Sequence, residues 1–145
     1  MAEILKGKVV ADKIKEKMIK DIEELKKNGK VPTLAIVRLG SNPDDISYEK
    51  SIIKNCEKVG IEAKVFERDI NMTTEELVAL MEELNNNNTI SGVLLFRPLP
   101  KHIDESKVRE ALSPNKDVDC MNPMNLAKIF EGDFSGFAPC TPKAA

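Results

Sequence analysis

The chain has 145 residues, of which 41% are hydrophobic and 32% are charged, and its formal net charge at pH 7 is -2. This length suits one domain that buries about two-thirds of the surface its unfolded form exposes. Charges of both signs are mixed along the chain, aromatic residues make up 4% and Trp is absent, so neither a basic nucleic-acid surface nor a base-stacking platform is expected.

The amino-terminal residues and the cysteines favour a cytoplasmic protein. Residues 1–6 lack the long apolar run of a signal peptide, and no stretch of the sequence is long and apolar enough to span a membrane. The cysteines, Cys56, Cys120 and Cys140, are odd in number and widely spaced. They form neither a CxxC pair nor a metal-binding spacing, so we expect three reduced structural thiols and no metal site.

The first half of the chain predicts a helix, a strand and a second helix. Apolar residues recur at helical spacing through residues 8–28. Residues 33–39 form a near-continuous apolar run, which is typical of a strand buried on both faces. The next helix is expected to be capped by Asp44 or Asp45 and to end at Gly60, the usual left-handed stop.

The second half continues the alternation of strands and helices. A second strand is predicted over residues 61–66 and a third over residues 90–96. Between them, residues 73–76 resemble a capping box that opens a helix, and this helix is expected to end within the asparagine run 85–88. Two shorter helices are predicted over residues 104–112 and 122–130.

Strands that alternate with helices predict βαβ crossovers. The expected fold is therefore an α/β domain of three layers, with a small parallel sheet and helices on both faces. In such sheets ligands bind at the carboxyl ends of the strands. The loops that follow the three predicted strands are 40–47, 67–72 and 96–102, and they are the places to look for a site.

Four short segments carry a more specific signal. They read SYEKSIIKNCEKVGI (47–61), GVLLFRPLPKHI (92–103), PNKDVD (114–119) and PCTP (139–142). In this order and at these separations they resemble the bifunctional methylenetetrahydrofolate dehydrogenase/methenyltetrahydrofolate cyclohydrolase family. The likeness runs from about residue 3 to the end, so residues 1–145 resemble the amino-terminal, folate-binding domain of that family.

The resemblance implies an enzyme of one-carbon metabolism that binds a reduced folate. Family members oxidise 5,10-methylenetetrahydrofolate by hydride transfer to NADP or NAD, and in most of them a cyclohydrolase step then opens the methenyl product with water. Members pair as homodimers, and the same is implied here. Neither a nucleic acid nor a membrane is an expected partner.

The resemblance also implies a set of folate-binding residues. Asp119 matches the aspartate that holds the pterin, where one carboxylate can accept from both the ring N–H and the adjacent amino group. Asp117 is two residues away and would point to the same side of an extended loop, so the sequence leaves both open. Tyr48 matches the tyrosine that lies against the folate rings. Further substrate-binding positions are Ser51, Ile52, Leu95, Phe96, Arg97 and Pro98.

Two positions depart from the family pattern. Most members carry a lysine four residues after the tyrosine, credited with the acid–base work of the cyclohydrolase step, and a glutamine that hydrogen-bonds it. Here these positions hold Ile52 and Phe96. Because both partners of this hydrogen bond are replaced, no polar group is left buried without a partner, which indicates a rebuilt pocket. Hydride transfer depends on positioning the folate and is expected to be retained, whereas the cyclohydrolase activity is in doubt. The catalytic residue is unknown, and Lys54 and Arg97 are candidate substitutes for the family lysine. His102 is expected to be a solvated or capping residue.

The domain that binds the nicotinamide cofactor is expected to be absent from this chain. No GxGxxG or other glycine-rich strand-to-helix turn occurs, and the family's cofactor domain follows segment 139–142, where Thr141 is expected to cap a helix. We therefore expect the chain to be inactive alone. The alternatives are a non-catalytic binding or interaction module and, ranked last, the amino-terminal domain of amino-acid dehydrogenases.

Overall fold

A computed structural model describes residues 7–144. Its strands are β1 (Thr33–Leu39), β2 (Glu62–Arg68) and β3 (Gly92–Leu95). Its helices are α1 (Gly7–Lys27), α2 (Pro43–Val59), α3 (Thr74–Asn86), α4 (Glu105–Ala111), α5 (Pro123–Phe130) and α6 (Cys140–Ala144). The elements predicted from the sequence are all present within a few residues of their expected ends.

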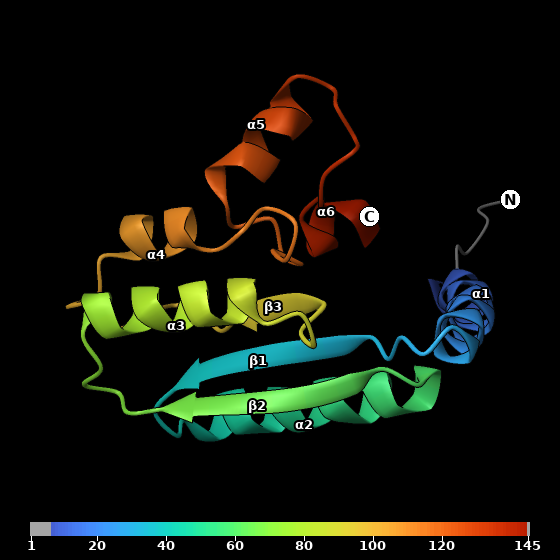
Figure 1. Cartoon of the computed structure of the whole chain (residues 1–145), viewed down its shortest axis with the longest axis horizontal. Coiled ribbons are helices and arrows are strands. Elements are labelled where there is room, and N and C mark those ends of the chain that lie inside the picture. The colour runs from blue at the N-terminus through green and yellow to red at the C-terminus, as the bar shows by residue number, and fades with distance from the viewer. Residues whose placement is uncertain (1–6, 145) are drawn as a thin grey trace, which may run out of the picture.

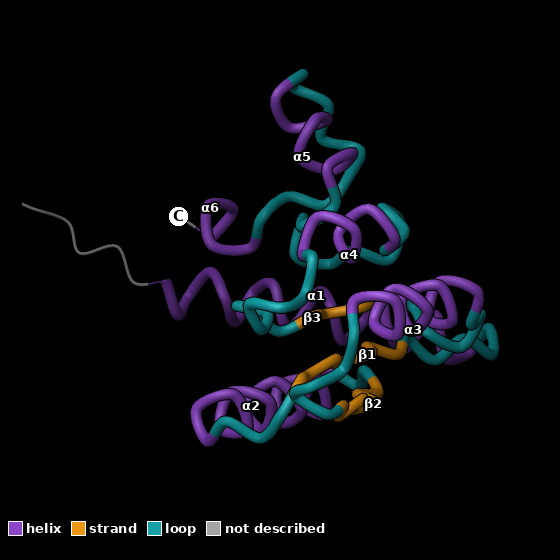
Figure 2. The backbone as a smooth tube through the Cα atoms, turned by 90° about the vertical axis from the view of Figure 1, so that its left-hand side faces the viewer, coloured by secondary structure: helices purple, strands orange, loops and turns teal. Residues whose placement is uncertain are grey.

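The strands form a parallel three-stranded sheet in the order β2-β1-β3 (Figure 1). Thr33 pairs with Glu62, and Leu34 pairs with Gly92, so β1 is the central strand. Helix α2 connects β1 to β2, and α3 connects β2 to β3 on the other side of β1. Helix α2 covers one face of the sheet and α3 covers the other, as the turned view in Figure 2 shows. The predicted α/β fold is confirmed, including the helices on both faces.

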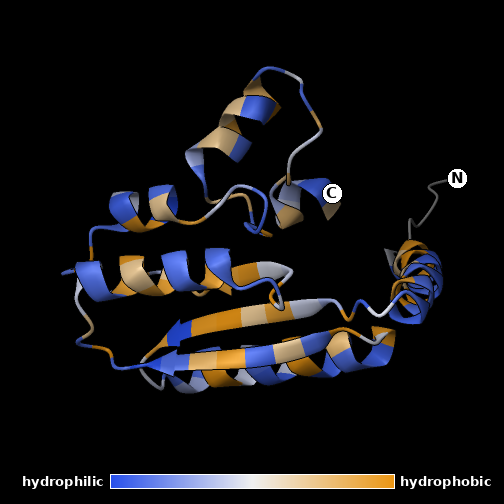
Figure 3. Ribbon diagram, in the orientation of Figure 1, coloured by the Kyte–Doolittle hydropathy of each residue, from blue (hydrophilic) through white to orange (hydrophobic). Residues whose placement is uncertain are grey.

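The main core lies between the sheet and the pair α3 and α4. It is built from apolar residues of β1, β3 and both helices, among them Ala35, Val37, Leu77, Met81 and Val108, all fully buried. On the hydropathy ribbon, β1 is largely orange and the exposed sides of α3 are blue (Figure 3). Because β1 is central and covered on both faces, its near-continuous apolar run is explained.

The cap of α2 differs from the expected one. The side chain of Asn42 accepts a hydrogen bond from the Asp44 backbone N–H at 2.9 Å, so Asn42 is the cap and the prediction of Asp44 or Asp45 is wrong. The reason is Pro43, whose fixed φ suits the first helical position, so the helix starts two residues before the start that an Asp44 cap would give. Gly60 ends the helix in the left-handed region (φ 87°), as predicted.

The other caps agree with the sequence except at the carboxyl-terminal helix. Thr73 and Glu76 form a complete capping box at the start of α3. Thr141, however, lies inside α6 rather than at its start, and the prediction that it caps this helix is wrong. A cap at Thr141 would need the Lys143 backbone N–H as a donor. This N–H donates instead to the Pro139 carbonyl at 3.2 Å.

Helix α1 exposes most of its apolar face. Val9 and Ile14 are more than half exposed, and Ile22 is the one buried residue of this helix. Figure 1 places α1 beside the amino ends of the strands, and its last turns, with Ile22 and Lys26, lie against Gly60 at the end of α2. Within residues 7–144, no helix has the length and apolar character needed to cross a bilayer.

Candidate functional site

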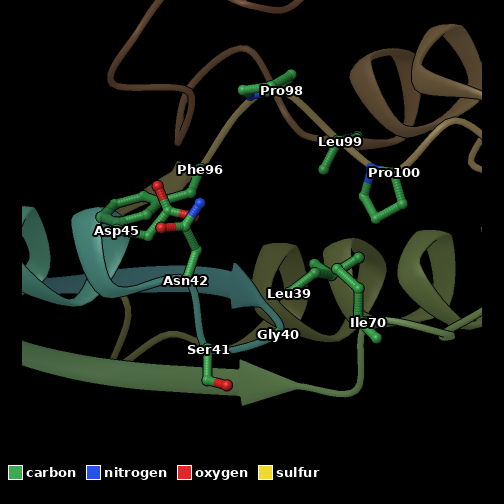
Figure 4. Close-up of a pocket in the computed structure, with 10 residues that line it drawn as sticks. All are labelled: Leu39, Gly40, Ser41, Asn42, Asp45, Ile70, Phe96, Pro98, Leu99 and Pro100. Atoms are coloured by element: carbon green, nitrogen blue, oxygen red, sulfur yellow. The ribbon is translucent and has the colours of Figure 1, made fainter.

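Two adjoining cavities open near the carboxyl ends of β1 and β3. The first, of about 440 Å³, is lined by five of the residues predicted from the sequence, namely Tyr48, Leu95, Phe96, Arg97 and Asp119. The second, of about 480 Å³, lies on the other side of Phe96 and includes Pro98 (Figure 4). Phe96 and Asp45 line both, so the two cavities share a wall, at the place where parallel sheets bind ligands.

An aromatic pair forms that shared wall. The ring centroids of Tyr48 and Phe96 lie 5.4 Å apart with an interplanar angle of 37°. Phe96 is held by the sheet, because its backbone N–H donates to the Val37 carbonyl at 2.9 Å. Tyr48 comes from the first turns of α2 and is 60% exposed, which leaves most of its ring available to a flat ligand.

A buried ion pair fixes the helix that carries Tyr48. Arg38 of β1 is 3% exposed, and its Nε lies 2.9 Å from the Glu49 carboxylate on α2. The same guanidinium donates to the Gly40 carbonyl and lies 3.2 Å from Glu67 of β2. Since Glu49 directly follows Tyr48, this pair sets the position of Tyr48 relative to the sheet.

Charged groups gather at the opposite side of the first cavity. Arg97 Nη2 lies 3.6 Å from Asp119 Oδ2, and Arg97 Nη1 lies 3.5 Å from Glu105 Oε1. The side chains of Arg97 and Asp119 are 39% and 36% exposed. Both therefore reach the cavity while remaining open to solvent and to a ligand.

The structure separates the two aspartates that the sequence left open. Asp117 is fully buried and its carboxylate accepts from the backbone N–H groups of Met121 and Asn122 and from the side-chain amide of Asn125, at 2.8–3.0 Å. These donors occupy the Asp117 carboxylate within the fold. Asp119 has no such bonds and lines the cavity, so of the two it is the one available to a ligand.

The segment that bears both aspartates lies along the free edge of β3. The Val93 backbone N–H donates to the Lys116 carbonyl at 2.7 Å, and Val93 and Asp117 form an isolated parallel bridge. Gly92 permits this close approach, because a Cβ there would lie 2.5 Å from Val118 Cγ1. The segment thus acts as a short fourth strand that carries Asp119 to the cavity.

Gly92→Ala is therefore expected to displace this segment. The added methyl group overlaps Val118, and overpacking of this kind destabilises by about 1–3 kcal/mol. Urea unfolding should show a lower free energy of unfolding. Adding Val118→Ala should restore most of it by removing the overlapping methyl groups, and an unrescued double variant would contradict this explanation.

The remaining predicted residues, apart from Pro98, line neither cavity. Ser51 is exposed and Ile52 half-buried, one turn after Tyr48 on α2. Lys54 is exposed and lines neither cavity. His102 is exposed and its Nε2 lies 3.0 Å from the Met72 carbonyl, so it ties two loops together as a local contact.

Sequence reasoning missed two polar residues of the first cavity. Asp45 lies three residues before Tyr48, and this helical spacing, which puts both on one face, was the available signal. Cys140 was expected to be a structural thiol, yet it is exposed and lines the cavity, unlike the buried Cys56 and Cys120. Partial desolvation and the nearby Asp119 carboxylate raise the pKa of the Cys140 thiol, so it stays protonated at neutral pH.

Comparison with known families supplies the decisive observation. Residues 5–119 match the model of the tetrahydrofolate dehydrogenase/cyclohydrolase catalytic domain. The chain belongs to this family. The matched range includes Tyr48, Phe96, Arg97 and Asp119 and every other residue that lines the first cavity except Cys140.

Individual relatives agree with this assignment. The bifunctional protein FolD of Clostridium botulinum is 54% identical over 144 residues, which cover 99% of this chain and 51% of the relative. Among solved structures, the bifunctional FolD of Campylobacter jejuni superposes with a TM-score of 0.90 at 39% identity, covering 94% of this chain and 49% of that one. A Trypanosoma brucei FolD complexed with NADP and an inhibitor gives a TM-score of 0.87 at 26% identity, covering 98% and 49%.

The chain therefore spans about half the length of the relatives it matches. The match to the catalytic-domain model favours this family over the amino-terminal domain of amino-acid dehydrogenases. Since the matched relatives are named as bifunctional enzymes, the alternative of a non-catalytic interaction module is not favoured either.

Proposed function

We propose that this chain is the folate-binding domain of a methylenetetrahydrofolate dehydrogenase. The observation that carries the proposal is the contrast between the two aspartates. The Asp117 carboxylate accepts three buried hydrogen bonds, whereas Asp119 lines a cavity that Tyr48 and Phe96 also line. An open carboxylate beside an aromatic wall has the chemistry that a reduced pterin requires.

In this proposal each side of the cavity has a separate task. The Asp119 carboxylate accepts from the ring N–H and the adjacent amino group of the pterin, a charge-assisted pair. The exposed ring of Tyr48 lies against the folate ring system, and the apolar side chains of Leu95 and Phe96 exclude water. The result is a folate held in one orientation, which is what hydride transfer demands of this half of the site.

The residues of this chain do not themselves fit a dinucleotide. In residues 7–144 the turns that follow β1, β2 and β3 contain one glycine, Gly40, and no glycine-rich strand-to-helix turn that would let backbone approach a pyrophosphate. We therefore propose that NADP or NAD is held by a second domain, in a cytoplasmic homodimer. The present chain supplies the folate side of the reaction.

The cyclohydrolase activity remains a separate question. Within the described residues, no lysine lines either cavity, and Phe96 packs against Tyr48 where the family's polar pair would lie. We propose that enzymatic hydrolysis of the methenyl product is missing. Fusing this chain to the carboxyl-terminal half of the Clostridium botulinum relative and assaying both steps would test it, with hydride transfer but only spontaneous hydrolysis as the expected result. Enzymatic hydrolysis that Arg97→Leu abolishes would contradict it.

Asp119→Ala is expected to weaken tetrahydrofolate binding by about ten- to a hundredfold, which is the loss of one or two hydrogen bonds to a charged group. Isothermal titration of the chain with tetrahydrofolate measures this directly. Asp21→Ala, which removes an exposed aspartate on α1, is the matched control and should bind like the original chain. Equal affinity of Asp119→Ala and the original chain would remove Asp119 from the pterin site.

A further inference from the structure

Arg97 is the basic side chain of the first cavity among the residues that the structure describes. It directly follows Phe96 at the end of β3 and lies between two carboxylates, Asp119 of the edge segment and Glu105 of α4. Groups from three separate parts of the chain thus fix the position of one guanidinium at the rim of the cavity.

The geometry leaves donors of Arg97 free. Its contacts with Asp119 and Glu105 measure 3.6 and 3.5 Å, longer than the 2.7–2.9 Å of a closed charge-assisted hydrogen bond. A guanidinium has five N–H donors and no acceptor, and here the two carboxylates orient it without using all of them. A ligand in the cavity therefore meets an acceptor, Asp119, and a donor, Arg97, side by side.

We propose that Arg97 is a specificity-determining residue that recognises the ring carbonyl of the bound folate. The inference rests on the proposed function and deepens it. The pterin ring carries an N–H donor and an oxo acceptor at adjacent positions. Asp119 accepts from the N–H and Arg97 donates to the neighbouring 4-oxo oxygen, so the pair distinguishes an oxo ring from one that carries an amino group there.

The surrounding charges favour the ring carbonyl over the glutamate tail of the folate as the group that Arg97 binds. A tail carboxylate would bring a third negative group to a guanidinium that already lies beside Asp119 and Glu105. A carbonyl oxygen accepts a hydrogen bond without adding charge. It also lies next to the ring N–H that Asp119 binds, which matches the short separation of Arg97 and Asp119.

The test compares two ligands on two variants by isothermal titration. The ligands are tetrahydrofolate and its 4-amino analogue, which places a donor opposite the Arg97 donor. Arg97→Leu is expected to bind tetrahydrofolate about tenfold more weakly, which corresponds to the loss of one charge-assisted hydrogen bond. It should bind the 4-amino analogue no more weakly than the original chain does. Lys50→Leu removes an exposed positive charge elsewhere on α2 and should change neither affinity.

Other outcomes would overturn the proposal. An equal loss of affinity for both ligands in Arg97→Leu would mean that Arg97 acts only through general attraction or folding. Arg97→Lys keeps the positive charge without the planar fork of donors, so it checks the effect of charge alone in a second variant. If tetrahydropteroate, which lacks the glutamate, binds equally to the original chain and to Arg97→Leu, the contact is with the tail. If the original chain and Asp119→Ala bind tetrahydrofolate equally while Arg97→Leu still loses selectivity, the assignment of Asp119 fails and that of Arg97 stands. No binding of tetrahydrofolate at all would overturn the proposed function together with this inference.

Discussion

Asp117→Ala is expected to lower the free energy of unfolding by about 3–5 kcal/mol, a large part of the stability of a domain of this size. The carboxylate of Asp117 is fully buried and accepts three N–H groups, from Met121, Asn122 and Asn125. Removing it leaves these donors buried without an acceptor. Asn125 also donates to the Pro114 carbonyl, so the start of α5 and the edge segment should loosen together.

Urea unfolding followed by circular dichroism measures this loss. Asp119→Ala is the matched control, two residues away and 36% exposed, and it should unfold within about 0.5 kcal/mol of the original chain. The two variants should therefore separate stability from ligand binding. Comparable destabilisation by Asp117→Ala and Asp119→Ala would show that the buried network does not hold the edge segment.

The second large effect is expected at Arg38. Arg38→Met should destabilise the domain by about 3–5 kcal/mol, because it leaves the carboxylate of Glu49 buried without its partner. Hydrogen exchange should report faster opening of α2, and tetrahydrofolate affinity should fall with it. The reason is that Tyr48 precedes Glu49 on the helix that this ion pair fixes to β1.

A double variant distinguishes the lost pair from lost packing. Arg38→Met combined with Glu49→Leu removes both charges, and apolar replacement of a buried pair is often neutral or stabilising. It should recover most of the stability that Arg38→Met loses. If the double variant is as unstable as the sum of the two single changes, the stranded charge is not the cause. Glu105→Gln breaks the ion pair with Arg97 at a side chain that is 40% exposed, and it should change stability by under about 1 kcal/mol.

Local patterns of the sequence account for the elements of the fold. The apolar run of residues 33–39 predicts a strand covered on both faces, and β1 is the central strand between α2 and α3. The capping box at residues 73–76 and the left-handed Gly60 are set by neighbours within a few positions. Such features depend on short-range sterics and hydrogen bonds, so a sequence contains them directly.

The wrong predictions come from competition between neighbours and from contacts outside each element. Pro43 moved the cap of α2 back to Asn42, and the Pro139 carbonyl took the donor that Thr141 needed. The apolar periodicity of α1 correctly predicted a helix. It could not show that Val9 and Ile14 would be exposed, because burial depends on which other element packs there.

Family likeness and cavity geometry contribute different parts of the candidate site. The motifs of the sequence predicted Tyr48, Phe96, Arg97 and Asp119 as a group, and the structure places all four on one cavity. The roles of these residues toward folate stay predictions until binding is measured. The spacing of Asp45 and Tyr48 was available in the sequence, whereas Cys140 reaches the cavity only through the path of the chain after α5.

The sequence by itself determined the α/β fold, the family and the absence of the lysine–glutamine pair, because each is a matter of residue type and spacing along the chain. Only the tertiary structure decided which aspartate is free. Asp117 and Asp119 are chemically alike and two residues apart, and what separates them is the packing of Val93 and Gly92 against their segment and of α5 beyond it. Those contacts bury one carboxylate among N–H donors and leave the other facing the cavity with Arg97 beside it.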